Sequence, residues 1–324
     1  MFQQNIAAAR LLYRVASVTV LLLCPAAACS RAPAPLCAIK VGVELPPGFA
    51  LLQSRQSALR GASGLTVDGS GTLWTVPEDE RKLLALSVTG SELGLQKRPV
   101  PLDGIDTAFE TESVVAIGPR RFAIGTERRG ERDVDAIFLV EVRERRAVVT
   151  RRIDLEYTAW GIRAEDNMGI EGLCHAGGRL VAALEPVIET GGQRYAPIGV
   201  LDPEGGRRRA LRLRLTTDSG KLSGLSCAAG PGGAVRVTAI ERHYGVARLL
   251  AFSIPPAPAS FQASKPETLS PSLLLDLGEL LHPLPNFEGI ARRGDDLFVI
   301  SDNQQRVTTG PVYLVRFTAS PTRR

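Results

Sequence analysis

The chain has 324 residues, 44% of them hydrophobic, and a formal net charge of +5 that comes from 34 arginines and only five lysines. The arginine clusters are scattered and interleaved with Glu and Asp, so no basic run is present to follow a nucleic-acid backbone, and we expect no nucleic-acid binding. This length is sufficient for one large domain with a substantial core, and the 32 glycines and 22 prolines fit many short strands joined by tight turns.

The first segment has the pattern of an export signal. Arg10 and Arg14 precede an apolar run over 15–23 that is too short to span a bilayer and is followed by small residues. The sequence therefore predicts a cleaved signal over residues 1–29.

The end of this segment, Ala26-Ala27-Ala28-Cys29, resembles a bacterial lipobox, although Ala stands where Leu is usual. A Pro-rich tether follows over 30–36. We expect a lipid anchor on Cys29 as the one membrane attachment, in the outer membrane or facing the periplasm. Secretion with a plain signal stays the alternative.

From residue 37 to 320 one strand–turn–strand unit recurs. Each copy begins with Ser or Glu, usually followed by Gly and an aliphatic residue, and its second strand ends near an acid. The five start residues lie about 50 to 65 residues apart, as in propellers and other repeat arrays. They are Ser63, Glu112, Glu171, Ser223 and Glu288.

A repeat of this length without a helical pattern forms one four-stranded sheet, which must stack on its neighbours to bury both faces. The fold prediction is therefore an all-β propeller. Five repeats are explicit, and the segments at 37–60 and 307–320 are expected to pair as a sixth blade. A five-bladed ring is the alternative.

The cysteines indicate one disulfide. With Cys24 and Cys29 in the signal region, Cys37, Cys174 and Cys227 are left in an oxidising compartment. Cys174 and Cys227 each follow a repeat start closely, so they are the predicted pair.

Several short motifs stand out between about residues 60 and 305. They are Asn167-x-Gly169-x-Glu171-Gly172-Leu173, Asn286-Phe287-Glu288-Gly289-Ile290, Ser63-Gly64-Leu65 with the following Leu73-Trp74, Glu127-Arg128 and Ser301-Asp302-Asn303. In these motifs the chain resembles the phytase-like (esterase-like activity of phytase) β-propeller family of exported bacterial proteins. The resemblance implies hydrolysis of phosphoesters with calcium.

The acids of the repeats are the candidate metal ligands. The first strand of every blade lines the central channel, so the start acids should converge, and the acids that end the second strands should lie at the same end. Carboxylates brought this close need a cation, and Ca²⁺ takes six to eight oxygen ligands. The predicted metal set is Glu112, Glu171, Glu288, Glu127, Glu185 and Asp302, with Asp79 and Glu241 as further exit acids.

Three basic residues closely follow exit acids. Arg128, Arg242 and His243 are therefore predicted to bind a phosphate or carboxylate of the substrate. These features predict a monomeric, calcium-assisted hydrolase of phosphoesters or related anionic esters. The alternative is a non-catalytic propeller that binds a small anionic ligand or an envelope protein, with acids that only accept backbone N–H bonds.

Overall fold

The computed structural model describes residues 38–39, 44–128, 134–162, 168–204, 208–256, 266–303 and 310–318. The predicted signal, Cys29, the tether and Cys37 lie outside these ranges. The described residues contain no α-helix; besides strands there are four short 3-10 turns, η1 (Ser57–Leu59), η2 (Tyr157–Trp160), η3 (Pro231–Gly233) and η4 (Leu277–Glu279). Among the described residues no helix is long and apolar enough to cross a membrane.

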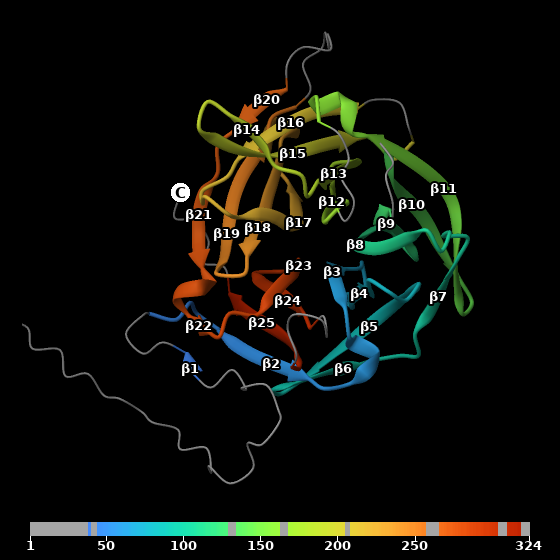
Figure 1. Ribbon diagram of the computed structural model, residues 1–324. Helices are drawn as coiled ribbons and strands as arrows, with labels where there is room; N and C mark the ends of the chain where they lie inside the picture. Colours follow the sequence, from blue (N-terminus) through green and yellow to red (C-terminus); the bar gives the residue numbers. More distant parts are fainter. Residues whose placement is uncertain are drawn as a thin grey trace, which may run out of the picture.

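Five blades, each built on an antiparallel pair of inner and second strands, stand around a central axis (Figure 1), which confirms the all-β propeller. Blades 1 to 3 follow the chain. Blade 1 contains β3 (Ala62–Val67), β4 (Leu73–Pro77) and β5 (Lys82–Thr89), with β6 (Glu92–Leu95) and β7 (Val100–Asp103) along its outer edge. Blade 2 contains β8 (Phe109–Gly118), β9 (Arg121–Arg128), β10 (Val134–Arg143) and β11 (Arg146–Glu156). Blade 3 contains β12 (Gly172–Ala176), β13 (Arg179–Ala183), β15 (Gln193–Leu201) and β16 (Arg208–Arg214), with β14 (Ile188–Thr190) and β20 (Glu267–Leu269) beside them.

Blades 4 and 5 complete the ring. Blade 4 contains β17 (Lys221–Ala229), β18 (Val235–His243), β19 (Val246–Ile254) and β21 (Ser272–Asp276). Blade 5 contains β23 (Asn286–Arg293), β24 (Asp296–Asp302), β25 (Val312–Thr318) and β2 (Ala50–Ser54). A short pair, β1 (Ala38–Ile39) and β22 (Leu281–His282), lies outside the blades.

The expected count of six blades is wrong for the described chain, and the alternative of five holds. The two chain ends do pair, through β2 and β25, but β25 also pairs with β24, so they are the outer half of blade 5. The physical reason is that β23 and β24 alone form half a blade. They need β25 and β2 as third and fourth strands to cover the apolar faces of the neighbouring blades. The strand from the N-terminal side thereby closes the ring.

The core consists of five apolar layers, one between each pair of neighbouring blades. Strand β10 shows why both faces of a blade are apolar. Ile137 and Leu139 face blade 3, while Ala136, Phe138 and Val140 face blade 1. Side chains alternate between the two faces of a strand, so the continuous apolar run in the sequence fills two layers.

The inner strands β3, β8, β12, β17 and β23 approach each other so closely that they need small residues. A Cβ on Gly289 would lie 2.5 Å from the carbonyl carbon of Gly64, and one on Gly64 would lie 2.7 Å from the backbone nitrogen of Val114. Real side chains cannot occupy such positions, so the Gly that follows most start residues is required by the radius of the ring.

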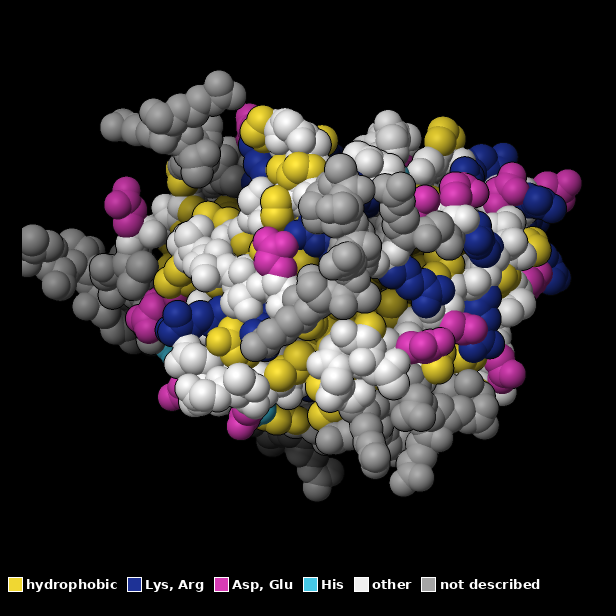
Figure 2. All heavy atoms as spheres, turned by 90° about the horizontal axis from the view of Figure 1, so that it is seen from above, with side chains coloured by type: hydrophobic (Ala, Val, Ile, Leu, Met, Phe, Trp, Pro, Cys, Tyr) yellow, Lys and Arg dark blue, Asp and Glu magenta, His cyan; other side chains and the backbone are white. Residues whose placement is uncertain are grey.

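On the face of the molecule shown in Figure 2, the Lys and Arg side chains are interspersed with Asp and Glu side chains. Several arginines of blade 2 form surface ion pairs, including Arg152 with Asp154 at 2.6 Å and Arg146 with Asp103 at 2.9 Å. The face shown in Figure 2 presents no continuous basic surface.

Candidate functional site

A β-bulge lies at the start residue in three of the five blades, and a fourth blade is irregular directly after it. The pairing of inner and second strands shifts between Thr111 and Ser113, between Leu222 and Gly224, and between Phe287 and Gly289, with a wider irregularity after Ser63. The extra residue of a bulge leaves the ladder and its side chain is re-aimed. Glu112 and Glu288 are such extra residues, and Glu171 immediately precedes β12.

The structure brings these three start acids together at one end of the channel, where all are buried. Burial raises the pKa of Glu112 well above its usual range, and the negative charges of Glu171 and Glu288 contribute to the rise. The convergence expected from the repeat spacing is therefore present. The other two start residues are serines that join blades: Ser63 donates to the carbonyl of Glu112 at 2.5 Å and Ser223 to that of Phe287 at 2.8 Å.

Five further side chains enter from the second strands. Each faces the backbone position two residues before a start residue. These exit residues are Glu78, Glu127, Glu185, Arg242 and Asp302.

Two of the expected exit acids were therefore misplaced by one residue. Asp79 is exposed, and Glu78 beside it contributes a negative charge to Glu112. Glu241 is fully buried, but its carboxylate accepts hydrogen bonds from the backbone N–H and hydroxyl groups of Thr216 and Thr217 at 2.6–3.1 Å. Neighbouring residues on a strand point to opposite faces, so in blade 4 it is Arg242 that faces the axis.

Three of the acids form a compact cluster. One carboxylate oxygen each of Glu127, Glu171 and Glu185 lies within 4.8 Å of the other two, and the residues are only 4–5% exposed. Glu185 Oε2 has no hydrogen-bond partner among the described residues. Three buried carboxylates in this arrangement, one of which carries an unsatisfied oxygen, fit a hard divalent cation.

Blade 4 supplies two cations to this end of the channel. Arg242 contacts both oxygens of Glu288, at 2.6 and 3.1 Å, and lies 3.8 Å from Glu171. Lys221 forms an ion pair with Glu185. Asn286 donates to Glu288 at 2.6 Å. Lys221 has no counterpart in the predicted set; only the pairing of β17 with β18 places it opposite Arg242.

The acids outnumber these two cations, and the pKa values reflect it. Burial raises the pKa of Glu288 to about 8 although Arg242 opposes the rise. Burial also raises the pKa of Glu127 to about 8, with Glu171 adding to the effect. Carboxyl groups that titrate near neutral pH can hold or release a proton under working conditions.

A buried pair lies behind the cluster. The Tyr157 hydroxyl forms a short hydrogen bond with Asp135 and lies 3.0 Å from the carbonyl oxygen of Met168. Burial raises the pKa of Asp135 to about 7, although the hydrogen bond from Tyr157 lowers it. This pair attaches η2 to the segment that leads into Glu171.

The predicted substrate-binding residues lie in different environments. Arg242 is turned inward and paired with carboxylates. His243 is half-buried at the end of β18, where its ring packs on the edge of the exposed Tyr244 at a centroid distance of 5.1 Å. The side chain of Arg128 lies outside the described residues. His243 therefore lies at the last residue of β18, next to the exposed Tyr244.

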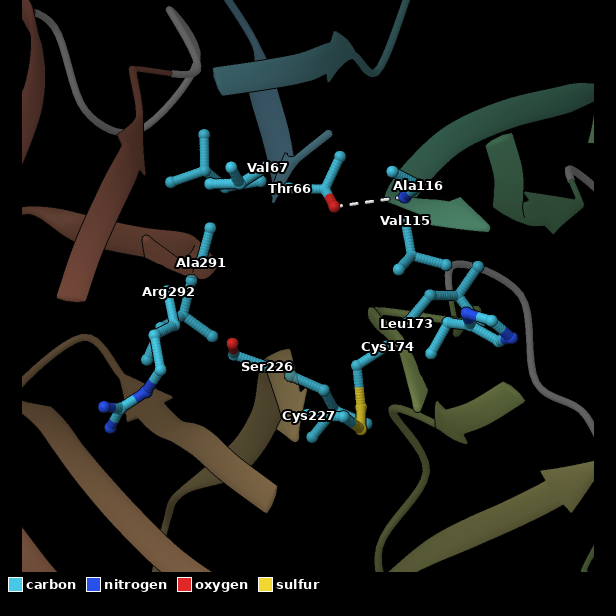
Figure 3. Close-up of a pocket in the computed structure, with 14 residues that line it drawn as sticks. Thr66, Val67, Val115, Ala116, Leu173, Cys174, Ser226, Cys227, Ala291 and Arg292 are labelled. Carbon is cyan, nitrogen blue, oxygen red and sulfur yellow. Dashed lines mark hydrogen bonds between the residues drawn. A yellow bond between two sulfur atoms is a disulfide. The ribbon is translucent and has the colours of Figure 1, made fainter. Parts of the chain in front are cut away.

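At the other end of the inner strands lies a cavity of about 100 Å³ (Figure 3). Residues from all five inner strands surround it, with the Thr66 hydroxyl accepting from the Ala116 N–H at 3.1 Å. The Cys174–Cys227 disulfide, which joins β12 to β17, forms part of the wall. The predicted disulfide is confirmed.

Comparison with known proteins gives a family and several structural neighbours. A model of the Phytase-like family, described as "Esterase-like activity of phytase", matches residues 57–305. A search of curated proteins gave no match.

The structural neighbours include a PQQ-bound aldose sugar dehydrogenase from Streptomyces coelicolor, with 11% identity, 84% of this chain and 99% of that chain covered, and a TM-score of 0.42. They also include a putative oxidoreductase (glucose dehydrogenase) from Thermus thermophilus, with 9% identity, coverage of 83% and 100%, and a TM-score of 0.43. A thermostable family-43 glycoside hydrolase has 8% identity, coverage of 84% and 97%, and a TM-score of 0.45. Likeness at this level says nothing about the activity of this chain.

Proposed function

The chain belongs to the Phytase-like family, and on that premise we propose that its acidic cluster binds a divalent cation, Ca²⁺ by preference, and supports hydrolysis of a phosphoester or related anionic ester. The observation that carries the proposal is the buried group of Glu127, Glu171 and Glu185 with an unsatisfied oxygen on Glu185. Carboxylate oxygens are ligands that Ca²⁺ prefers, and these residues would supply part of the six to eight oxygens that it takes.

In this proposal Glu127, Glu171 and Glu185 hold the cation, and Glu112, Glu288 and Asp302 line the channel around it. A bound cation would polarise a phosphoryl oxygen and lower the pKa of a bound water. The chain's own residues supply the rest. Arg242 offsets the charge of Glu288, and His243, which follows it at the end of β18, would contact the anionic group of an incoming ester.

The test is calorimetric titration of the purified protein with CaCl₂, with Glu171→Gln as the site variant. Glu141→Gln is the matched control because Glu141 forms an exposed ion pair with Arg143. We expect binding in the wild type and the control and none in the site variant. Hydrolysis of p-nitrophenyl phosphate and p-nitrophenyl acetate is then measured with calcium and with EDTA. Absence of calcium binding in the wild type would refute the cation site.

A non-catalytic binding propeller is the second candidate. It is favoured by the way Arg242 and Lys221 satisfy internal carboxylates instead of facing solvent. Calcium binding without turnover of either ester, together with calorimetric binding of a small anion such as inorganic phosphate, would support this candidate over the hydrolase.

We also propose that the protein acts outside the cytoplasm, attached through lipid on Cys29, as a monomer whose partner is a small anionic ligand or an envelope protein. The Cys174–Cys227 disulfide supports export because such bonds persist in oxidising compartments. Radiolabelled palmitate incorporation that is lost in Cys29→Ala is the expected result, and labelling that persists in that variant would contradict the anchor.

A further inference from the structure

Lys221 is placed among the acids by its position in blade 4. It stands two residues before the start residue Ser223, where the other blades carry Gly61, Glu110, Gly169 and Asn286. Its ammonium group forms an ion pair with Glu185, which is one of the three carboxylates of the compact cluster. Blade 4 alone therefore directs a lysine at the candidate cation ligands.

The ammonium group and a divalent cation would compete for the same carboxylate. Glu185 Oε1 accepts from Lys221, while Oε2 has no hydrogen-bond partner among the described residues. Two positive ions held by one buried carboxylate repel each other strongly, because the surroundings screen charge far less than water does. Glu185 therefore cannot hold the ammonium group and a divalent cation at the same time without a loss of affinity for the cation.

The Lys221 side chain is able to move away from Glu185, whereas the Arg242 side chain is held in place. The Lys221 side chain is 28% exposed and is a flexible chain that carries a point charge. The Arg242 side chain is 15% exposed and contacts both oxygens of Glu288. A bidentate contact of this kind fixes the guanidinium group in place.

We propose that Lys221 is a built-in competitor for the cation site, which neutralises Glu185 in the cation-free protein and is displaced when a divalent cation binds. The inference rests on the proposed cation site. The consequence is that a higher concentration of the divalent cation is needed to occupy the cluster. Until the cation binds, the ammonium group of Lys221 offsets the negative charge of the buried carboxylates.

The experiment compares calcium affinities by calorimetric titration of the full protein. Lys221→Met should bind Ca²⁺ about tenfold more tightly than the wild type or better, which corresponds to ~1.4 kcal/mol. Lys221→Arg keeps the charge and should bind no more tightly than the wild type. Lys82→Met is the matched control because Lys82 pairs with Glu80 away from the channel, and its affinity should be unchanged.

Equal or weaker calcium binding by Lys221→Met would overturn the inference while leaving the proposed function intact. No binding by any variant, the wild type included, would instead refute the cation site itself. If Lys221→Met does not fold without calcium, the same comparison is made with Lys221→Gln, where equal or weaker binding again overturns the inference. In both neutral variants the calcium-induced rise in Tm should exceed that of the wild type.

Discussion

Substituting Glu127 by Gln should stabilise the cation-free protein at pH 8 and have little effect at pH 5. Burial and the negative charge of Glu171 raise the pKa of Glu127 to about 8 in the folded protein. In an unfolded chain a glutamate has a pKa of about 4.3. Gln has the shape of the protonated acid and no charge, so it removes the cost of ionising this buried group.

The sign follows from proton binding. Between about pH 4.3 and pH 8 the folded protein holds the Glu127 proton and the unfolded chain does not, so the free energy of unfolding falls as pH rises through this window. At about 1.4 kcal/mol per pH unit, the loss from about pH 4.3 approaches ~4 kcal/mol at pH 7. This is an upper value because neighbouring acids share the shift.

The assay is thermal and urea unfolding in EDTA at pH 5, 6.5 and 8. Since 1 kcal/mol moves the Tm of a large domain by roughly 2–4 °C, the variant should gain several degrees at pH 8. Glu141→Gln, on the exposed surface, should show no such dependence on pH. If Glu127→Gln changes the Tm equally at pH 5 and pH 8, or lowers it at pH 8, the reasoning is refuted. Either result would show that burial and the neighbouring carboxylates do not raise the cost of ionising Glu127.

Three further substitutions test the structural parts of the site. Glu241→Ala removes the acceptor of four donors, two on the exposed Thr216 and two on the half-buried Thr217, and we expect a loss of about 2 kcal/mol in the free energy of unfolding with calcium affinity unchanged. Altered calcium affinity would place Glu241 in the site after all. Gly289→Ala should cost more than about 2 kcal/mol because its Cβ meets backbone at 2.5 Å, whereas Gly69→Ala meets nothing within 4 Å; equal urea midpoints for the two would contradict the close approach of the inner strands. Replacing Cys174 and Cys227 together by Ala opens a loop of 53 residues and should lower the free energy of unfolding by ~4 kcal/mol; an unchanged urea midpoint under oxidising conditions would argue against the bond.

Local patterns in the sequence were sufficient for the architecture. A start residue, a Gly-bearing turn and two apolar strands recur five times, and each repeat is one sheet that must stack on its neighbours. The same phasing places Glu112, Glu171 and Glu288 on inner strands and Cys174 near Cys227. These conclusions depend only on position within a repeat, which is visible in one dimension.

The number of blades could not be obtained in this way. Strands β2 and β25 are far apart in the sequence, and their pairing alone fits a sixth blade as well as the outer half of the fifth. Only the pairing of β24 with β25 shows that these strands belong to the fifth blade. Which strands share a sheet depends on contacts between distant segments, and these leave no periodic signal.

The composition of the site was likewise decided by tertiary structure. Neighbouring residues of a strand point to opposite faces, so Glu78 and Arg242 face the axis in place of Asp79 and Glu241, and Lys221 enters opposite Arg242. The sequence by itself determined that acids gather at one end of the channel. Only the folded ring decided that two cations of blade 4 lie among them, because a shift of one residue in a strand turns its side chains to the other face.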